Sequence, residues 1–305
     1  SMQKMQQSEW MASLPRPVTE RKLSRIFLPG SHNASSFFMD SDSQVTSDFS
    51  AAIRLISSEK FVRKALAHWM KEQILSIEEQ LELGIRYLDI KVSKIDQEFF
   101  SINGLRCGKV KDVLQSVYRF VTKHQKEVVL VHLRGLYNCD QADLSALASL
   151  FSVQFNSLLY EDDDISKDQL MDVSLRELWR NQHQVIGLVD GIGRGCSVWD
   201  GLLFTQISQG ESDAMGDVVE DFLSGQHDKD SKQLKVFTAA VTVSMPTVMA
   251  HPFDNFEKMF GRPATRQLTS WLRKDASEHR DQLAVVCADF VDEEGFVDAV
   301  ISLNR

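Results

Sequence analysis

The chain has 305 residues, 43% of them apolar and 25% charged, which is the composition of a globular protein with a core and excludes a disordered or fibrous chain. Its 34 basic and 43 acidic side chains leave a net charge of −9, which argues against a nucleic-acid partner and against strong, non-specific adhesion to anionic membranes. The four cysteines lack the spacing of a metal or redox site, and no apolar run is long enough to span a bilayer, so we expect a cytoplasmic protein with free thiols.

The first residues are expected to lie outside the fold. Ser1 and Met2 resemble a cloning remnant, and we expect 1–8 to be flexible and 9–305 to form one domain.

Short β-rich runs then alternate with amphipathic helices. The predicted strands are, in chain order, Arg25–Pro29, Arg86–Val92, Glu127–Arg134, Gln184–Asp190, Leu202–Gln206, Lys235–Val241 and Leu283–Phe290. Apolar residues at helical spacing predict helices over Val110–Val121 and Leu144–Leu158. Capping-box pairs predict two more helix starts, at Ser76 with Glu79 and at Ser174 with Glu177.

Strand followed by helix, repeated along the chain, predicts parallel strands with crossover connections. An open doubly wound sheet and a closed barrel both fit this order. No strand is followed by a convincing G-x-G-x-x-G turn, and Gly191–Gly195 is compatible with a flexible loop or a phosphate-binding loop. We therefore predict an α/β fold, a distorted TIM-type (β/α) barrel of one domain, with surface loops at Asp40–Ser50 and Glu161–Asp168.

Charged residues mark the carboxyl ends of several predicted strands, where such barrels have their active sites. His32 follows the first strand, Arg134 ends the third and Asp289 lies on the last. Asp89 and Lys91 share one face of the second strand, because strand side chains alternate. Charges at the ends of apolar faces indicate the mouth of a barrel rather than its core.

Three segments resemble parts of a known family, and they occur along the chain in the order expected of that family. They are Phe27–Ser36, which contains P-G-S-H, Glu79–Asp89, which ends in G-I-R-Y-L-D, and Glu127–Val131. The chain thereby resembles the phosphatidylinositol-specific phospholipase C (PI-PLC) X-domain family, in particular its stand-alone X-domain-containing proteins. The likeness extends from Glu9 to the region around Phe290 and so covers nearly the full chain.

The resemblance implies a phosphodiesterase. His32 matches the general base on the inositol 2-hydroxyl, which attacks phosphorus to give a cyclic phosphate, and Asp289 matches the aspartate that orients this base. Asp89 matches a carboxylate that contacts the inositol, and Arg134 a cation near the phosphate. The alternatives are a turn-closing role for His32, a helix cap at Asp289 and a structural ion pair for Arg134.

Three positions depart from the family pattern. Asn103 stands near the place of the second histidine, which protonates the departing alkoxide, and an amide cannot release a proton. Asn33 replaces the aspartate that supports this histidine in metal-independent members. Lys91 replaces their arginine, which keeps the charge but loses the bidentate grip on phosphate. Because loss of a general acid costs roughly 10²–10⁴ in rate, we expect impaired cleavage.

We expect neither a metal nor another cofactor. Calcium-dependent members use asparagine and several carboxylates in this region, whereas Lys91 and Arg134 would place cations there. The histidines lack zinc-site spacing, and His132 is expected to be a core residue.

Two functions from different classes fit this sequence. The first is a phosphoinositide phosphodiesterase that contacts membranes transiently, and the second is a degenerate barrel that binds an inositol phosphate or a protein without turnover. Both predict a positively charged anion pocket beside His32 and Asp289. Its expected substrate- and phosphate-binding residues are Asn33, Asp89, Lys91, Asn103 and Arg134.

Overall fold

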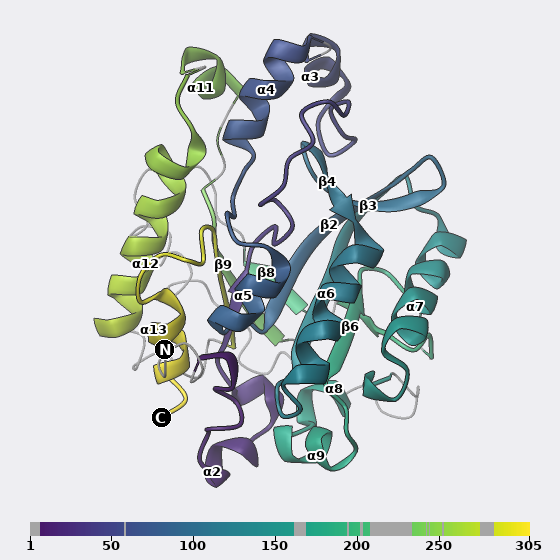
Figure 1. The fold of residues 1–305 in the computed structure, drawn as a ribbon, viewed down its shortest axis with the longest axis vertical. Coiled ribbons are helices and arrows are strands. Elements are labelled where there is room, and N and C mark those ends of the chain that lie inside the picture. The colour runs from purple at the N-terminus through teal and green to yellow at the C-terminus, as the bar shows by residue number, and fades with distance from the viewer. Residues whose placement is uncertain are drawn as a thin grey trace.

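Parallel strands follow one another in chain order around a curved sheet in the computed structural model of the protein (Figure 1). The structure describes residues 7–57, 59–161, 169–193, 195–201, 204–207, 234–241, 243, 245–251, 253–274 and 284–305. The parallel strands within these ranges are β1 (Leu28–Ser31), β2 (Tyr87–Ile95), β5 (Val129–Tyr137), β6 (Val185–Val189), β7 (Trp199–Asp200), β8 (Phe204–Ile207), β9 (Leu234–Ala239) and β10 (Val285–Ala288).

The sheet has the strand order of a barrel with one open seam. The order is β7-β6-β5-β2-β1-β10-β9-β8, so the first and last strands are neighbours. Gly30 of β1 pairs with Tyr87 of β2 on one side and with Cys287 of β10 on the other. Within the described residues, no pairing joins β7 to β8. The predicted distorted barrel is confirmed, and the doubly wound alternative is wrong.

The predicted strands all overlap observed ones, with shifts at their ends. The first begins at Leu28 because Leu23–Arg25 form a 3₁₀ turn (η1). Residues 202, 203 and 283 of the predicted strands lie outside the described residues, as do 162–168 of the acidic loop and 194 of the glycine-rich loop. Short β7 was not predicted.

An antiparallel hairpin at the end of β2 was also missed. It comprises β3 (Glu98–Asn103) and β4 (Leu105–Lys109), with Gly104 between them at φ +73°. The hairpin extends β2 beyond the barrel, and its inner end brings Asn103 back towards the strand ends.

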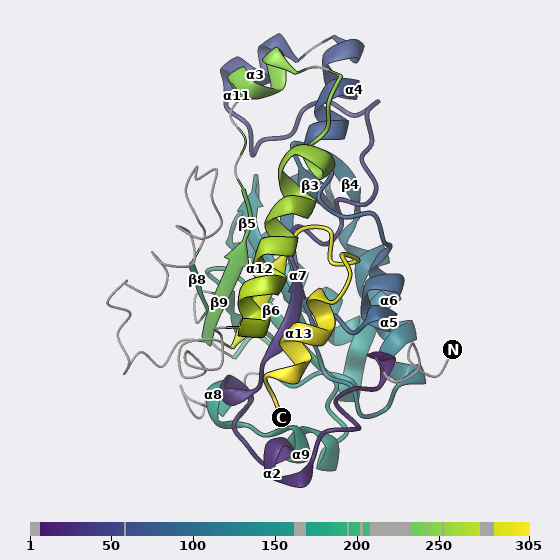
Figure 2. The same ribbon diagram turned by 90° about the vertical axis from the view of Figure 1, so that its left-hand side faces the viewer.

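Helices cover the outside of the sheet (Figures 1 and 2). The predicted helices are confirmed as α6 (Val110–Lys123) and α7 (Gln141–Phe155), which is followed by the 3₁₀ turn η2 (Asn156–Leu158). Both predicted capping boxes are present and begin α5 (Ile77–Leu83) and α9 (Leu175–Arg180). The other helices within the described residues are α2 (Arg16–Thr19), α3 (Ala51–Ile56), α4 (Lys60–Trp69), α8 (Gln169–Asp172), α11 (Met245–Ala250), η4 (Glu257–Gly261, a π-helix), α12 (Arg262–Lys274) and α13 (Phe296–Ser302).

A buried ion pair lies at the amino end of the barrel. Arg86 and Glu127 are fully buried, with their charged groups 2.7 Å apart. Arg86 also donates to the carbonyls of Leu81 and Ser8, both at 2.8 Å. Glu127 accepts hydrogen bonds from the backbone of the first described segment, including Ala12 at 3.1 Å. The pair thus connects two strand starts to this segment.

The long connection between β1 and β2 forms part of a lobe beyond the strand ends. Helices α3, α4 and α11 lie together there, at the top of Figures 1 and 2. The expected surface loop Asp40–Ser50 is only partly a surface loop, since Ser43, Val45 and Thr46 are buried. Thr46 donates its amide to the carbonyl of Gly104 at 2.9 Å, which holds the segment against the hairpin.

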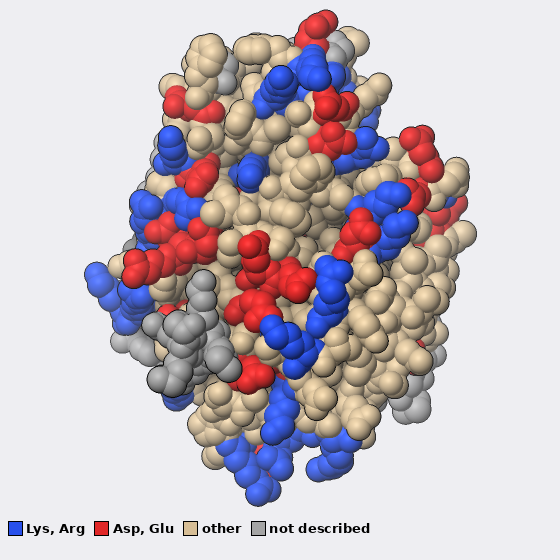
Figure 3. Space-filling view, in the orientation of Figure 1, with Lys and Arg blue, Asp and Glu red and all other residues tan. Residues whose placement is uncertain are grey.

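Acidic and basic side chains are interspersed on the face seen in Figure 3. The acidic side chains over α5 meet basic ones over α6, including the ion pairs Arg119–Glu78 at 3.1 Å and Lys123–Glu82 at 2.6 Å. No described helix combines the length and apolarity needed to cross a bilayer.

Candidate active site

His32 lies directly after β1, at the carboxyl end of the barrel. Its amide donates to the carbonyl of Ala288 at 3.1 Å, and its own carbonyl accepts from Nε2 of Gln73 at 2.9 Å. Close packing of β1 on β10 requires glycine at position 30, because a Cβ there would overlap the Cys287 sulfur. This packing brings His32 to the same edge as Asp289.

The imidazole of His32 is held by Asp289. Nδ1 donates to Oδ1 at 2.8 Å, and the His32 side chain is 14% exposed whereas Asp289 is buried. Burial lowers the pKa of His32, which favours the neutral imidazole that a general base needs. Asp289 is not a helix cap, because α13 begins seven residues later at Phe296.

The pKa of Asp289 is raised well above its usual range. Burial is the largest cause and the nearby carboxylate of Asp89 adds to it. Oδ2 of Asp289 has no hydrogen-bond partner among the described residues. The carboxyl group is thus poorly solvated, and the imidazole of His32 is its main stabilising contact.

Glu72 is a third member of the site and was not predicted from the sequence. Its Oε2 accepts from Nδ2 of Asn33 at 2.6 Å and lies 3.3 Å from Nδ1 of His32. Its backbone is fixed on both sides, since its amide donates to Oγ of Ser36 and its carbonyl accepts from Phe290. The only sequence signal was a polar triplet, 71–73, before a helix cap.

Glu72→Gln is expected to stabilise the protein near pH 8 and to have little effect near pH 4. Burial, followed by Asp289, raises the pKa of Glu72, so the folded chain binds more protons than the unfolded chain. The stability that this proton contributes is present below the unfolded pKa of about 4.3 and is lost as the pH rises through the folded pKa. Glutamine at position 72 carries no charge at any pH, so the protein no longer loses this stability at high pH. Its side-chain oxygen can still accept the hydrogen bond from Asn33. Melting temperatures of both proteins at the two pH values measure the effect, with a gain of a few degrees expected near pH 8.

Glu79→Gln is the matched control for this experiment. Hydrogen bonds from Ser76 lower the pKa of Glu79, so its substitution is expected to destabilise the protein near pH 8. A Glu72→Gln gain that is the same at both pH values would contradict the raised pKa.

Asp89 of β2 and Arg134 of the neighbouring β5 form a two-point ion pair. Nε of Arg134 contacts Oδ1 of Asp89, and Nη2 donates to Oδ2 at 2.8 Å. Burial would raise the pKa of Asp89, but the guanidinium of Arg134 outweighs it and lowers this pKa to about 2. Nη2 of Arg134 also donates to Oδ1 of Asn33 at 3.2 Å, which turns the amide nitrogen of Asn33 towards Glu72 and His32.

Lys91 points into the same end of the barrel and is held by two groups. Its Nζ donates to Oδ1 of Asn103 at 2.9 Å and lies 3.6 Å from Oδ2 of Asp48. Nδ2 of Asn103 donates to the carbonyl of Met70 at 2.7 Å. Asn103 therefore connects Lys91 to the segment that presents Glu72. Asp48 was also missed, since it lies in the expected surface loop.

The expectation of a positively charged pocket needs correction. The structure brings all seven predicted site residues to one end of the barrel, but it adds Glu72 and Asp48, and each predicted cation faces a carboxylate. Arg134 is paired with Asp89, and Lys91 lies beside Asp48. Among the described residues of the site, carboxylates outnumber cationic side chains.

His132 is buried within the barrel, as expected of a core residue. Its Nδ1 lies 2.6 Å from the hydroxyl of Tyr87 and its Nε2 lies 2.7 Å from Oδ1 of Asp190. Both ring nitrogens have partners, so His132 is not positioned to replace a missing acid near His32.

One group of described residues brings several metal-binding side chains together. His32, Glu72 and Asp289 each place one ligand atom within 4.8 Å of the others. The group fits calcium poorly, because the ion prefers six to eight oxygen ligands and here an imidazole is bonded directly to a carboxylate. The amide nitrogen of Asn33 also faces Glu72, where a metal would need an oxygen.

Comparison with known proteins places the chain near one family. The PI-PLC X family model (PI-PLC X 1) matches residues 58–191. Human PI-PLC X domain-containing protein 2 is 33% identical over 183 residues, and the mouse protein of the same name is 32% identical. These matches cover 59% of this chain and only 58% and 52% of the two relatives. Mouse PI-PLC X domain-containing protein 3 is 25% identical over 307 residues, 97% of this chain and 93% of that protein.

Solved structures show the same fold. The phosphatidylinositol-specific phospholipase C from Listeria monocytogenes superposes with a TM-score of 0.68 at 15% identity, over 98% of this chain and 99% of that chain. The Staphylococcus aureus enzyme gives a TM-score of 0.69 at 13% identity, over 99% of each chain. At such identities the likeness concerns the barrel and not its chemistry.

Proposed function

Because the chain belongs to the PI-PLC X-domain family, we propose that it is a phosphoric diester hydrolase that acts on a phosphoinositide. The observation that carries this proposal is the contact of His32 with Asp289 at the carboxyl end of the barrel. It gives a neutral imidazole with a fixed Nδ1–H and with Nε2 on the opposite side of the ring. This is the arrangement of a general base.

The reaction begins with proton transfer from the inositol 2-hydroxyl to Nε2 of His32. The hydroxyl oxygen then forms a bond to phosphorus, and the bond from phosphorus to the glycerol oxygen breaks. The product is a cyclic phosphate, and Asp289 stabilises the imidazolium that forms. Asn103 cannot protonate the leaving alkoxide, so that proton comes from solvent and the step is slow.

The paired cations determine how the phosphate can bind. Nζ of Lys91 has three donors, so it can bind a phosphate oxygen while it shares its charge with Asp48. Arg134 likewise shares its guanidinium with Asp89. The carboxylate of Glu72 lies next to the base and repels an anion unless it is protonated. These contacts favour slow turnover.

The same contacts support a second candidate function. A barrel whose site cations are already neutralised and whose acid position holds Asn103 has the features of a binding protein without turnover. Its ligand would be an inositol phosphate or a protein partner.

A comparison of substrates with different leaving groups distinguishes the phosphodiesterase from the binding protein. A phosphodiesterase without a general acid is expected to cleave an inositol phosphodiester with a phenolate leaving group, which needs no proton, far faster than phosphatidylinositol. We expect a ratio of about 10²–10⁴, the usual contribution of a general acid. The measurement is the release of phenolate and of diacylglycerol by the same preparation. No turnover of either substrate, with measurable inositol phosphate binding, would establish the binding function instead.

We also propose that the protein works in the cytoplasm, next to membranes. None of the four cysteines, which all lie in the described part of the chain, forms a disulfide bond, as expected in a reducing compartment. Large apolar side chains are exposed on the lobe beyond the strand ends, including Phe253 at 91% and Leu55 at 78%. Such side chains suit brief contact with a lipid surface.

A further inference from the structure

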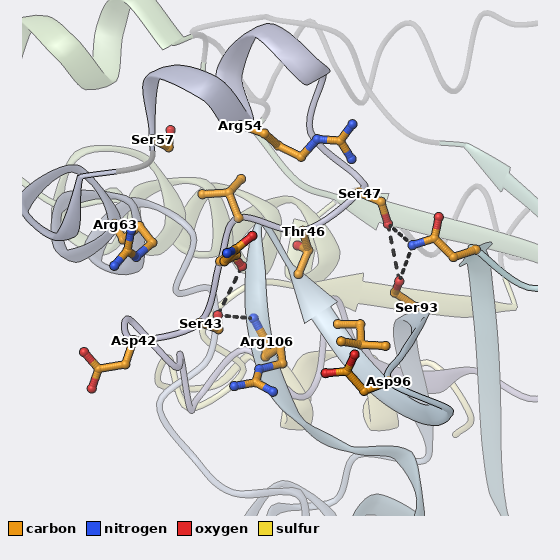
Figure 4. Close-up of a pocket in the computed structure, with 14 residues that line it drawn as sticks. Asp42, Ser43, Thr46, Ser47, Arg54, Ser57, Arg63, Ser93, Asp96 and Arg106 are labelled. Atoms are coloured by element: carbon orange, nitrogen blue, oxygen red, sulfur yellow. Dashed lines mark hydrogen bonds between the residues drawn. The ribbon is translucent and has the colours of Figure 1, made fainter.

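A cavity of about 820 Å³ lies in the lobe, next to the candidate active site (Figure 4). It is bounded by residues 42–47, by α3 and α4, and by the ends of β2 and β4. Its lining includes Ser93, which lies two residues beyond Lys91 on the same face of β2. The hydroxyls of Ser93 and Ser47 are 3.3 Å apart. The cavity is thus a neighbour of the His32 site and shares none of its described residues.

Five hydroxyl side chains lie in the lining of this cavity. They belong to Ser43, Thr46, Ser47, Ser57 and Ser93. Ser57 is 1% exposed, and its Oγ has no hydrogen-bond partner among the described residues. A buried hydroxyl without a partner is costly, so this group indicates a polar ligand in the cavity. A wall of this kind suits a ligand that has several hydroxyl groups.

Arginines add positive charge to the wall. Arg54, Arg63 and Arg106 line the cavity together with two acidic residues, Asp42 and Asp96. Arg106 is paired with Asp40 at 2.9 Å, and Asp42 is paired with Lys60 at 2.6 Å. Within the part of the chain that the structure describes, the guanidinium of Arg54 has no ion-pair or hydrogen-bond partner. It extends from α3 along the upper edge of the cavity, whereas Asp96 lies at the lower edge (Figure 4).

The surroundings of the cavity indicate a lipid as the source of the ligand. Leu55, directly after Arg54, is 78% exposed, and Phe61 at the start of α4 is 64% exposed. Met249 and Phe253, near the neighbouring α11, are 67% and 91% exposed. Basic side chains are visible over α4 in Figure 3, and α4 contains Lys60, Arg63 and Lys64. Apolar side chains beside cationic ones are typical of a surface that meets an anionic bilayer.

We propose that this cavity binds the phosphorylated, hydroxyl-rich headgroup of an anionic phospholipid, with Arg54 on the phosphate and Ser57 on a hydroxyl. The bound lipid would hold the mouth of the barrel against the membrane while the His32 site stays open to another molecule. The proposal does not depend on turnover, because the cavity shares no described residue with the catalytic site.

The test is a vesicle flotation assay in the His32→Ala background, so that no lipid is consumed. Vesicles of phosphatidylcholine alone are compared with vesicles that also contain a phosphatidylinositol phosphate. Arg54→Gln is expected to weaken binding to the anionic vesicles about tenfold, the effect of one charge-assisted hydrogen bond. Ser57→Ala is expected to weaken it a few-fold. Melting curves verify that each variant is folded.

Arg21→Gln is the matched control, since it removes the same charge from an exposed position just after α2, at the opposite end of the barrel. It is expected to bind as the parent does. Equal losses in the Arg21 and Arg54 variants would overturn the proposal in favour of non-specific charge attraction. Calorimetry with a soluble inositol phosphate distinguishes the ligand source. Binding of the soluble compound that depends on Arg54, without binding to vesicles, would overturn the lipid assignment.

Discussion

His32→Ala is expected to lower the turnover of the phenolate-leaving substrate by about 10²–10⁴, because removal of the general base leaves the inositol hydroxyl without a proton acceptor. The imidazole is 14% exposed and is the main stabilising contact of the buried Asp289 carboxyl, so the melting temperature should also fall. The measurement is kcat together with a melting curve. Turnover that survives in this variant would show that another group removes the proton.

Asp289→Asn is the companion variant. Asparagine keeps the shape but cannot stabilise an imidazolium, so kcat should fall while substrate binding is retained. The parent enzyme should lose activity at acid pH only below the usual histidine pKa of about 6.5, because burial lowers the pKa of His32. If activity already falls above about pH 6.5 as the solution is acidified, the imidazole of His32 is not held in its neutral form.

Breaking the buried ion pair at the other end of the barrel is expected to have the largest effect on stability. Arg86→Met leaves the carboxylate of Glu127 buried and without its cation, which typically costs about 3–5 kcal/mol. It also removes the hydrogen bonds from Arg86 to the Ser8 and Leu81 carbonyls. Urea unfolding curves of the variant and the parent measure this loss of unfolding free energy.

The double variant Arg86→Met, Glu127→Leu tests the cause. With both charges removed, the penalty for an unpaired buried charge disappears, so the double variant should be more stable than Arg86→Met alone. If the two losses simply add, the pair is not coupled and the contacts of Arg86 with backbone carbonyls explain its importance.

Most of the fold could be predicted because each barrel element leaves a local pattern in the sequence. The helix α6 has apolar residues at helical spacing, and α5 begins at a complete capping box. The β3–β4 hairpin was missed because Glu98–Lys109 lacks strict alternation, and its place is set by pairing with β2. Hydrophobic periodicity and capping boxes describe single helices and strands. The register of a hairpin depends instead on its contacts with the rest of the fold.

The residues of the candidate site likewise include some that the sequence predicts and others that it does not. His32 and Asp289 directly follow β1 and β10. Asp89 and Arg134 lie on the neighbouring β2 and β5, so strand pairing alone brings the four residues together. Glu72 and Asp48 come from the long connection between β1 and β2, and their positions depend on single contacts such as those of Phe290 with Glu72 and of Thr46 with Gly104. No periodicity in the sequence encodes such contacts. The carboxylates that Glu72 and Asp48 add to the site were therefore not predicted.

The orientation of Asn33 has a consequence for how this protein can diverge from its relatives. Arg134 holds the amide oxygen, so the side chain presents its nitrogen to Glu72. An aspartate at position 33 would place a carboxylate oxygen where the amide nitrogen now donates to Glu72, and this buried contact would be repulsive unless one of the two carboxyl groups is protonated. The effect of a substitution at position 33 therefore depends on the residue at position 72, and the two side chains act as one unit in this site.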